Sequence, residues 1–560
     1  RDGKLVQAID FDVLRQELAR EIVEGREERY AFTWPDKRQA ILAANAPINA
    51  TLRPVVADSV GRDGTAGAFD SENLYIEGDN LDVLKLLQET YLGKVKMIYI
   101  DPPYNTGNDA FVYDDDFAMA GGDFHATNGW RDEDGAMQYD LRANNVSNGR
   151  FHTDWLNMIY PRLKVAKTLL ADDGVIFISV DYNENFNMRK VADEILGVQS
   201  FIGEIYWESK TKSQNTKTAY NKLQPKAEMI LVYAKDRQRR FHLIEKGVKE
   251  YPFSDERGVY REYPVEVMNA SGVRGRESMI YEISDTVSTY LKNGDLFIRD
   301  GKPIIKMRPN GERNETTEPF WGFFDKTMGT AESAKKELGE LIENHGFETV
   351  KPVEIIKRLC FHATDKDALI LDFFSGSATT AHAVMQLNAE DGGHRKFIMV
   401  QLPEATDEGG TAYKAGYRNI CEIGKERIRR AGAKIAAEAG EKAAGLDIGF
   451  RCLRLDTSNM TDVYYAPDAV TQDGLFAQVD NVKADRTPED LLVQTMLDLG
   501  ILLSESITVE EIAGKRVFNV ADGFLLACFD RDVTDETVTA IAKRKPYYAV
   551  FRDASMADDS

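Results

Sequence analysis

The chain has 560 residues, 43% hydrophobic and 29% charged, with a formal net charge of −22. Because domains average roughly 150 residues, this length predicts about three or four of them. No apolar run reaches the ~18 to 20 residues needed to cross a bilayer, and no basic segment followed by an apolar signal core begins the sequence, so we expect a cytoplasmic protein.

Charge and metal-binding residue types narrow the function further. A net charge of −22 counts, by itself, against a nucleic-acid partner, because affinity for DNA depends on neutralising phosphates. The four cysteines and seven histidines are scattered, with no C-x-x-C or H-E-x-x-H pair. We therefore expect neither a disulfide framework nor a metal site.

Apolar periodicity predicts alternating strands and helices along much of the chain. An amphipathic helix over 11–25 comes first, and further elements follow from 73 onward. They are strand 73–77, helix 80–91, strand 96–100, helix 153–170, strands 174–181 and 227–236, a strand, glycine turn and helix within 367–387, and strand 396–404. This alternation predicts a doubly wound α/β fold.

Three segments depart from this pattern. The polar stretch 109–149 is expected to be a mobile loop, and the weak periodicity of 237–346 indicates an inserted domain. After a helix rich in Ala, Glu, Lys and Arg from about 421, the region from about 447 mixes short strands and helices. It carries no chemical motif, so we interpret it as an interaction or dimerisation region.

A local basic run lies between Ser209 and Lys226, where no acid occurs. Its lysines are Lys210, Lys212, Lys217, Lys222 and Lys226. Such a run, taken alone, is more typical of a solvated loop than of a binding site.

The stretch "LDFFSGSATTAHAV", from Leu371 to Val384, joins a strand to a helix through a turn at Gly376. The backbone of such a turn can approach a nucleotide-like ligand at the carboxyl end of the strand. The three glycines of a dinucleotide fingerprint and the lysine of a P-loop are missing, which disfavours NAD and ATP. Alone, the pattern is equally typical of an ordinary strand-to-helix turn.

The stretch "MIYIDPPYNTGND" places two prolines directly after a predicted buried strand. Asp101 and the carbonyls of a rigid Pro102–Pro103 turn can accept hydrogen bonds from an amino group, and Tyr104 offers a flat face for stacking a base. When acceptors bind both hydrogens of an amine, the lone pair of its nitrogen is localised and can attack an electrophile. A simple Pro-Pro turn is the structural alternative.

Together, "DPPY" and the downstream "DFFSGSATT" resemble the signature of S-adenosylmethionine-dependent amino-group DNA methyltransferases, in the motif order of the beta group. The segments "NLYIEGDNLDVLKLLQETYLGKVKMIYIDPPYNTGND", "KPVEIIKRL" and "DFFSGSATTAHAVMQLN" further resemble the modification subunit of type III restriction–modification systems, over about residues 9 to 460. The resemblance implies a Rossmann-like core with an inserted target-recognition domain and a C-terminal α+β appendage. It implies methylation of N6 in a flipped-out adenine.

The resemblance assigns roles to individual residues. Asp101, Pro102, Pro103 and Tyr104 would bind the adenine. The expected cofactor-binding residues are Asp79, Lys351, Pro352, Asp372, Phe373, Phe374, Ser375, Gly376, Ser377, Thr379, Gln401 and Glu404, with either Gln401 or Glu404 at the cofactor ribose. Because the five lysines lie at the entrance to the expected recognition domain, contact with DNA phosphates explains them better than a solvated loop does. We expect the 109–149 loop to close over the flipped base.

The resemblance also predicts partners and boundaries. We expect duplex DNA, a homodimer and a helicase-nuclease restriction subunit as partners. The predicted segments are 1–70 (N-terminal helical extension), 71–236 (catalytic half), 237–346 (target recognition), 347–420 (cofactor half) and 421–560 (helical connector and C-terminal interaction domain). Methylation of N4 of cytosine or of RNA in the same pocket, and a non-catalytic DNA-binding or assembly subunit, remain alternatives.

Overall fold

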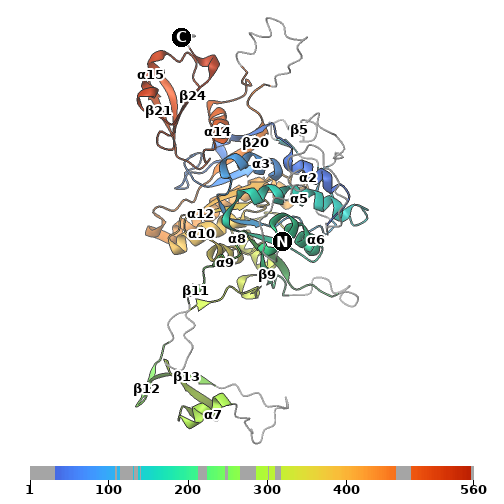
Figure 1. The fold of residues 1–560 in the computed structure, drawn as a ribbon, viewed down its shortest axis with the longest axis vertical. Coiled ribbons are helices and arrows are strands. Elements are labelled where there is room, and N and C mark those ends of the chain that lie inside the picture. The colour runs from blue at the N-terminus through green and yellow to red at the C-terminus, as the bar shows by residue number, and fades with distance from the viewer. Residues whose placement is uncertain are drawn as a thin grey trace, which may run out of the picture. The chain divides into compact units, whose positions relative to one another are not determined.

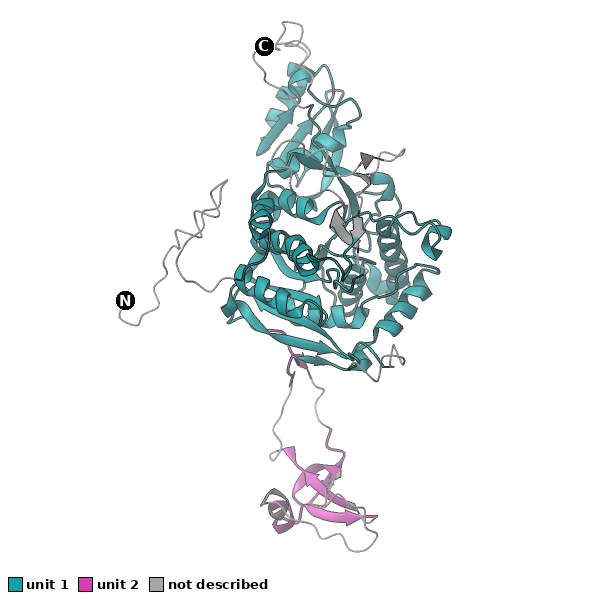
Figure 2. Ribbon diagram, turned by 90° about the vertical axis from the view of Figure 1, so that its right-hand side faces the viewer, with its two compact units in different colours: residues 1–240, 321–560 teal, residues 241–320 magenta. Residues whose placement is uncertain are grey.

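The computed structural model describes residues 32–107, 110–113, 130–131, 137–138, 141–211, 223–245, 250–264, 285–300, 302–309, 317–461 and 481–556. The helix expected over 11–25 lies outside this part of the chain. The chain divides into two compact units, residues 1–240 with 321–560, and residues 241–320 (Figure 2).

A ten-stranded sheet forms the centre of the larger unit (Figure 1). In spatial order its strands are β1 (Ala50–Pro54), β20 (Arg451–Thr457), β2 (Leu74–Glu77), β19 (Lys396–Gln401), β18 (Leu369–Asp372), β3 (Val95–Ile100), β8 (Leu170–Val180), β10 (Glu228–Ala234), β9 (Phe201–Trp207) and β17 (Phe323–Phe324). The run from β20 to β8 is parallel, whereas β1 and β10 pair antiparallel with it. The predicted α/β fold is confirmed.

Helices pack around this sheet in two groups. The first comprises α2 (Lys37–Asn45), α3 (Asn80–Tyr91), α5 (Phe151–Leu169), α6 (Asn185–Leu196) and α14 (Pro488–Asp498). The second comprises α8 (Ala331–Leu341), α9 (Val353–Ala363), α10 (Thr379–Asp391) and α12 (Ile420–Ala439). Ile98 and Ile100 of β3 join the apolar core with α3 and α5, while the alternate side chains Met97 and Tyr99 are buried on the other face. A strand buried on both faces explains the uninterrupted apolar sequence.

Local sequence explains where α3 begins. Asp79 is its N-cap, and its Oδ1 accepts hydrogen bonds from the backbone nitrogens of Leu81 (2.8 Å) and Asp82 (3.3 Å). The buried stripe of Val83, Leu84, Leu87 and Tyr91 holds the helix against the core. This fixes the start of α3 at the carboxyl end of β2.

The segment predicted as a mobile loop contains short strand pairs. Strand β4 (Ala110–Tyr113) pairs with β7 (Leu141–Ala143), and β5 (Trp130–Arg131) pairs with β6 (Met137–Gln138). The other residues of 114–140 lie outside the described part of the chain.

The C-terminal region contributes to the main sheet through β20, which lies beside β2. Helix α14 packs on α3 and β1, and the backbone nitrogen of Leu503 donates to the Tyr91 hydroxyl at 3.0 Å. Beyond it, β21 (Ile507–Ile512), β22 (Lys515–Val520), β23 (Leu525–Cys528) and β24 (Tyr548–Phe551) form a small sheet next to α15 (Asp535–Lys543). Part of this region therefore shares the core of the larger unit, while one side of the small sheet and α15 form a separate apolar cluster of Ile512, Val517, Leu526, Cys528, Val533 and Ile541.

The smaller unit is built on β12 (Phe253–Asp255), β13 (Gly258–Pro264), β15 (Lys302–Met307) and β14 (Leu296–Arg299), with α7 (Asp285–Lys292) and the pair β11 (Ile244–Glu245) and β16 (Thr317–Glu318). Arg308 stabilises it by pairing with Asp255 at 2.7 Å and Asp295 at 2.9 Å.

The remaining elements are short. They are α11 (Thr411–Lys414) and 3-10 helices at Val56–Asp58, Val198–Ser200, Lys326–Met328, Gly440–Ala443 and Asp553–Ser555. Among the described helices, none combines the length and apolar character needed to cross a membrane.

Candidate active site

The two sequence motifs meet at one edge of the central sheet. Strands β3 and β18 are parallel neighbours, with Ile98 opposite Leu371, so Asp101 and Asp372 follow the register to the same edge. Gln401 ends β19, and Asp79 follows β2 at this edge. The carboxyl ends of parallel strands are where open α/β sheets bind ligands.

Lys351 connects the residues of the DPPY turn. Its Nζ lies 2.8 and 2.7 Å from the two carboxylate oxygens of Asp101, and it donates to the Tyr104 hydroxyl at 2.8 Å. The Tyr104 hydroxyl donates to Glu228 Oε2 at 3.0 Å, and that carboxylate lies 3.5 Å from Lys351 Nζ. The ammonium is thus held between two carboxylates.

The charges of this cluster support one another. Burial favours the neutral form of Lys351, but Asp101 and Glu228 outweigh it and raise the pKa of the amine. Burial and the same two carboxylates raise the pKa of Tyr104 well above its usual value. Lys351 therefore stays charged and Tyr104 stays a neutral hydroxyl at physiological pH.

Side chains behind the turn hold it rigid. Trp155, which is fully buried, donates from Nε1 to the Pro103 carbonyl at 2.7 Å. Asn105 takes a left-handed conformation (φ 57°), which asparagine tolerates better than most residues. Its amide donates to the buried Glu184 at 2.6 Å and accepts from Asn144 at 2.9 Å. Buried side chains therefore hold both Pro103 and Asn105, which restrains the turn that follows Asp101.

The glycine turn after β18 is equally ordered. The backbone nitrogen of Gly376 (φ 49°) donates to Gln401 Oε1 at 2.7 Å, and that of Ser375 donates to the Val400 carbonyl at 3.2 Å. Ala378, the N-cap of α10, also has a positive φ of 59°. Gln401 thus supports the turn by a direct hydrogen bond.

The turn has the properties of a ligand cradle. A Cβ built on Gly376 would meet no atom within 4 Å, so space remains in front of the backbone. The buried hydroxyl of Ser375 has no hydrogen-bond partner in the part of the chain that is described. A buried hydroxyl without a protein partner is suited to hydrogen-bond a ligand.

Arg427 of α12 lies beneath this turn. Its Nη1 donates to the Ser377 hydroxyl (2.8 Å), the Ser377 carbonyl (3.3 Å) and the Thr379 hydroxyl (2.7 Å). The side chain is fully buried, and burial lowers the pKa of the guanidinium to about 10. A buried cation therefore anchors the end of the cradle to a distant helix.

The start of α3 supports the other end of the turn. The Asn80 amide donates to the Phe373 carbonyl at 2.7 Å, and Arg162 donates to Asp79 Oδ2 at 2.7 Å and to the Asn80 side chain. Asp79 thus acts here as a helix cap and an ion-pair partner. Phe373 is fully buried, and Phe374 packs against the core.

Burial dominates the electrostatics of Asp372. It raises the pKa of this carboxyl to about 7, helped by the charge of Asp101 and opposed by hydrogen bonds from Thr380 Oγ1 (2.5 Å) and the Phe374 nitrogen (3.1 Å). Burial also raises the pKa of Glu404, beyond β19, to about 7. Both carboxyls are near half ionisation at neutral pH and would respond to a cationic ligand.

The predicted site residues that the structure describes lie in two places. The first is the pair of adjoining turns described above, and Pro352 is the N-cap of α9 directly after Lys351. Lys210 and Lys226 lie at the base of the β9–β10 connection, where Lys226 pairs with Glu208 at 2.6 Å. Lys212, Lys217 and Lys222 lie outside the described residues.

Sequence reasoning missed Glu228, Arg162, Arg427 and Glu184. A signal existed for Glu228, because it is a lone acid that opens the apolar strand "EMILVYA". Arg427 lies in a helix rich in charged residues, where nothing in the local sequence distinguishes it.

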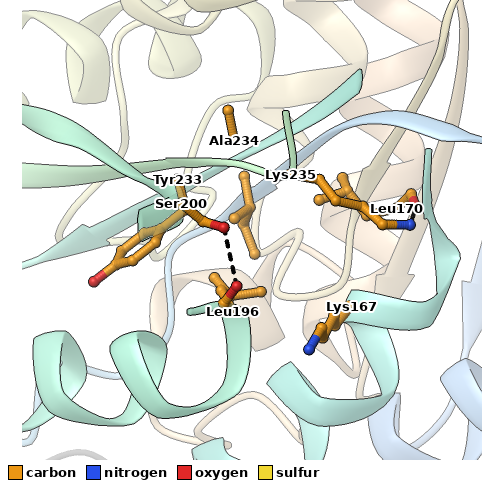
Figure 3. Close-up of a pocket in the computed structure, with 8 residues that line it drawn as sticks. Lys167, Leu170, Leu196, Ser200, Tyr233, Ala234 and Lys235 are labelled. Atoms are coloured by element: carbon orange, nitrogen blue, oxygen red, sulfur yellow. Dashed lines mark hydrogen bonds between the residues drawn. The ribbon is translucent and has the colours of Figure 1, made fainter. Parts of the chain in front are cut away.

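Two other features contain none of the predicted site residues. Figure 3 shows a pocket lined by Lys167, Leu170, Ile176, Leu196, Ser200, Tyr233, Ala234 and Lys235, none of which belongs to the predicted site. Its cavity of about 20 Å³ has room for roughly one water molecule. Asp58, Glu77 and Cys452 approach closely enough to hold a cation, but Lys425 pairs with both carboxylates, with Glu77 at 2.6 Å.

Comparison with known proteins identifies relatives along most of the chain. The family model described as DNA methylase, N6_N4_Mtase, matches residues 95–430. The StyLTI Mod subunit, a type III restriction-modification enzyme of Salmonella typhimurium, is 36% identical over 72% of this chain, which spans 63% of that protein. The EcoPI Mod subunit of Escherichia phage P1 is 32% identical over 81% of this chain and 75% of its own length.

Solved structures show only weak likeness. The cytosine-N4-specific PvuII DNA methyltransferase is 14% identical, with a TM-score of 0.31 over 68% of this chain and 97% of its own. The M1.HpyAVI–SAM complex is 12% identical, with a TM-score of 0.29 over 63% of this chain and 98% of its own.

Proposed function

Because this chain belongs to the N6_N4_Mtase family of DNA methylases, we propose that it transfers a methyl group from S-adenosylmethionine to N6 of adenine in duplex DNA, as the modification subunit of a type III restriction–modification system. The observation that carries the proposal is the junction of the two turns, which brings the Asp101 carboxylate beside the glycine cradle after β18.

The residues present fit this cofactor. S-adenosylmethionine supplies an electrophilic methyl group on a positively charged sulfonium. The open face of Gly376 and the unpartnered Ser375 hydroxyl are suited to its amino-acid end, and Gln401 or Glu404 to its ribose. Asp372 adds a buried carboxyl that a cation would ionise.

The turn residues would prepare the adenine for attack. The target base must first leave the duplex, which costs a few kcal/mol of lost stacking and pairing. The Asp101 carboxylate and the Pro102 carbonyl would accept the two N6 hydrogens, so the nitrogen lone pair turns toward the methyl group. A new N–C bond forms as the S–C bond breaks, the sulfur keeps the bonding pair, and N6 then loses one proton to solvent.

Analysis of the product tests this proposal. Unmethylated plasmid DNA and an RNA transcript are incubated with labelled cofactor, digested to nucleosides and examined by mass spectrometry. We expect N6-methyldeoxyadenosine. N4-methyldeoxycytidine, or label confined to RNA, would show that the pocket serves the alternative substrate, and no transfer would favour a non-catalytic subunit.

We further propose that residues 237–346, which include the smaller unit 241–320, recognise the target sequence and that the five lysines of 210–226 contact phosphates. Replacing all five by glutamine is expected to make the negative slope of log affinity against log salt shallower by about 4.5, since each phosphate contact contributes about 0.9. Fluorescence anisotropy with a duplex over a salt series measures this slope. A variant with Lys543 and Lys545 replaced is the control, and an unchanged slope in the fivefold variant would refute the assignment.

Cofactor affinity is expected to depend on pH through Asp372. Its pKa of about 7 lies above the unfolded value, so without ligand this carboxyl contributes stability that is lost as pH rises toward 7. A cationic cofactor favours the ionised form, so affinity should rise about tenfold between pH 6 and pH 8. Calorimetry measures the affinity and the proton released, and Asp372→Asn should reduce both effects, leaving only the contribution of Glu404, whose pKa is also raised to about 7. A wild-type affinity that is flat over this range would contradict the prediction.

Assembly belongs to the same proposal. The named relatives are Mod subunits of type III enzymes, and we propose that this chain forms a homodimer and binds a restriction subunit that supplies helicase and nuclease activity. Light scattering of the isolated chain would report a mass of twice 63.0 kDa if the dimer forms.

A further inference from the structure

Lys351 places a positively charged nitrogen at the carboxylate proposed to bind the adenine amine. Its ammonium nitrogen donates to both Asp101 oxygens, at 2.8 and 2.7 Å, and to the Tyr104 hydroxyl. The same nitrogen lies 4.9 Å from the centroid of the Tyr104 ring and 5.8 Å from that of Trp207. It therefore stands where both acceptor and stacking contacts of a base would form.

The pair creates a conflict with the proposed reaction. Positive charge develops on N6 as it attacks, and a carboxylate that faces this nitrogen stabilises the charge. A lysine bound to both oxygens of Asp101 neutralises that carboxylate. Transfer would therefore be faster if the ammonium first moved away.

Glu228 offers the ammonium a second position. Its Oε2 is already 3.5 Å from Lys351 Nζ and accepts from the Tyr104 hydroxyl at 3.0 Å. A charge-assisted hydrogen bond is about 2.8 Å long, so a shift of less than about 1 Å would complete a Lys351–Glu228 pair. The flexible four-carbon stem of lysine permits such a movement, and the two carboxylates are only 14% and 29% exposed.

We infer, on the basis of the proposed function, that Lys351 and Glu228 are positioning residues of the methyl transfer. Lys351 pairs with Asp101 until a base enters and then pairs with Glu228. Once Lys351 has moved to Glu228, the Asp101 carboxylate presents its negative charge to the amine and to the cofactor sulfonium. In the unliganded site Lys351 prevents two half-buried carboxylates from repelling each other across Tyr104.

This exchange predicts an unusual pattern of variants. In Glu228→Gln the ammonium has no second carboxylate and stays on Asp101, so transfer slows about tenfold. In Lys351→Met the two carboxylates face each other without a cation, and this also slows methyl transfer. The double variant loses both the cation and the surplus carboxylate, leaving Asp101 free, and should be faster than either single variant.

Single-turnover methyl transfer to unmethylated plasmid DNA, at saturating cofactor, measures these rates. Glu204→Gln, a half-buried carboxylate of the next strand near Arg189, is the matched control and should transfer at the wild-type rate. Cofactor affinity, measured for every variant, should change less than the rates and shows that each is folded. If Glu228→Gln fails to fold, Glu228→Asp takes its place, with a smaller slowing and the same rescue by Lys351→Met.

The outcomes separate the two proposals. A double variant faster than both single variants supports the exchange. A double variant that is no faster than one of the two single variants, with active wild-type protein, overturns the exchange and leaves the proposed function intact. Wild-type protein that binds cofactor but methylates no DNA overturns both.

Discussion

Replacing Asp101 by alanine is expected to lower the rate of methyl transfer by at least about 10²- to 10³-fold, the usual effect of removing a group that stabilises charge in a transition state. The loss combines two effects at one position. The amine loses its charged acceptor, and the Lys351 ammonium, which Asp101 binds with both oxygens, loses its principal partner.

Rates from single-turnover assays and cofactor affinities from calorimetry together test this prediction. Cofactor affinity should remain within a few-fold of wild type, because the glycine turn is held by Gln401, Asn80 and Arg427 and not by Asp101. Asp101→Asn keeps one acceptor oxygen without the charge and should give an intermediate rate. A folded Asp101→Ala protein that methylates at the wild-type rate would disprove the assignment.

Replacing Arg427 by methionine is expected to weaken cofactor binding about tenfold or more while changing thermal stability little. Hydrogen bonds from a charged group contribute about 1.5–3 kcal/mol, and about 1.4 kcal/mol corresponds to tenfold in affinity. Without the bonds to Ser377 and Thr379, the end of the cradle is free to move.

The small effect on stability has a separate cause. Nε and Nη2 of Arg427 are buried without partners among the described residues, and a buried cation replaced by an apolar side chain of similar length often leaves stability unchanged. Calorimetry for the cofactor and a thermal melt provide the two measurements. Arg430→Met is the control, because this residue of the same helix is 48% exposed and pairs with Glu426. Unchanged cofactor affinity in Arg427→Met would contradict the anchoring role.

The sequence predicted those parts of the site that lie in contiguous motifs at strand ends. Asp101 and Tyr104 follow an apolar strand, and Gly376 follows another, so their positions come from local pattern and from the rule that parallel strands end at one edge. The α/β fold follows from the same alternation of strands and helices.

Contacts between distant segments could not be predicted in this way. Glu228 and Arg427 are single charged residues whose importance depends on what packs beside them. The motif containing Lys351 was expected beside the cofactor, but its placement on Asp101 depends on the junction between α9 and β3. Likewise, the alternation of β20 does not reveal that this late strand pairs with β2 in the main sheet.

Helix α3 serves the site and the C-terminal region at once. Its first turn binds the glycine turn after β18 through Asn80, and its last residue, Tyr91, accepts a hydrogen bond from Leu503 beside α14. The helix is 12 residues, or about 18 Å, long, and it is rigid over that distance because its stripe is buried. A protein that binds the C-terminal region would therefore act through α3 on the proposed cofactor site. Deleting α14 would remove the packing that holds the far end of this helix.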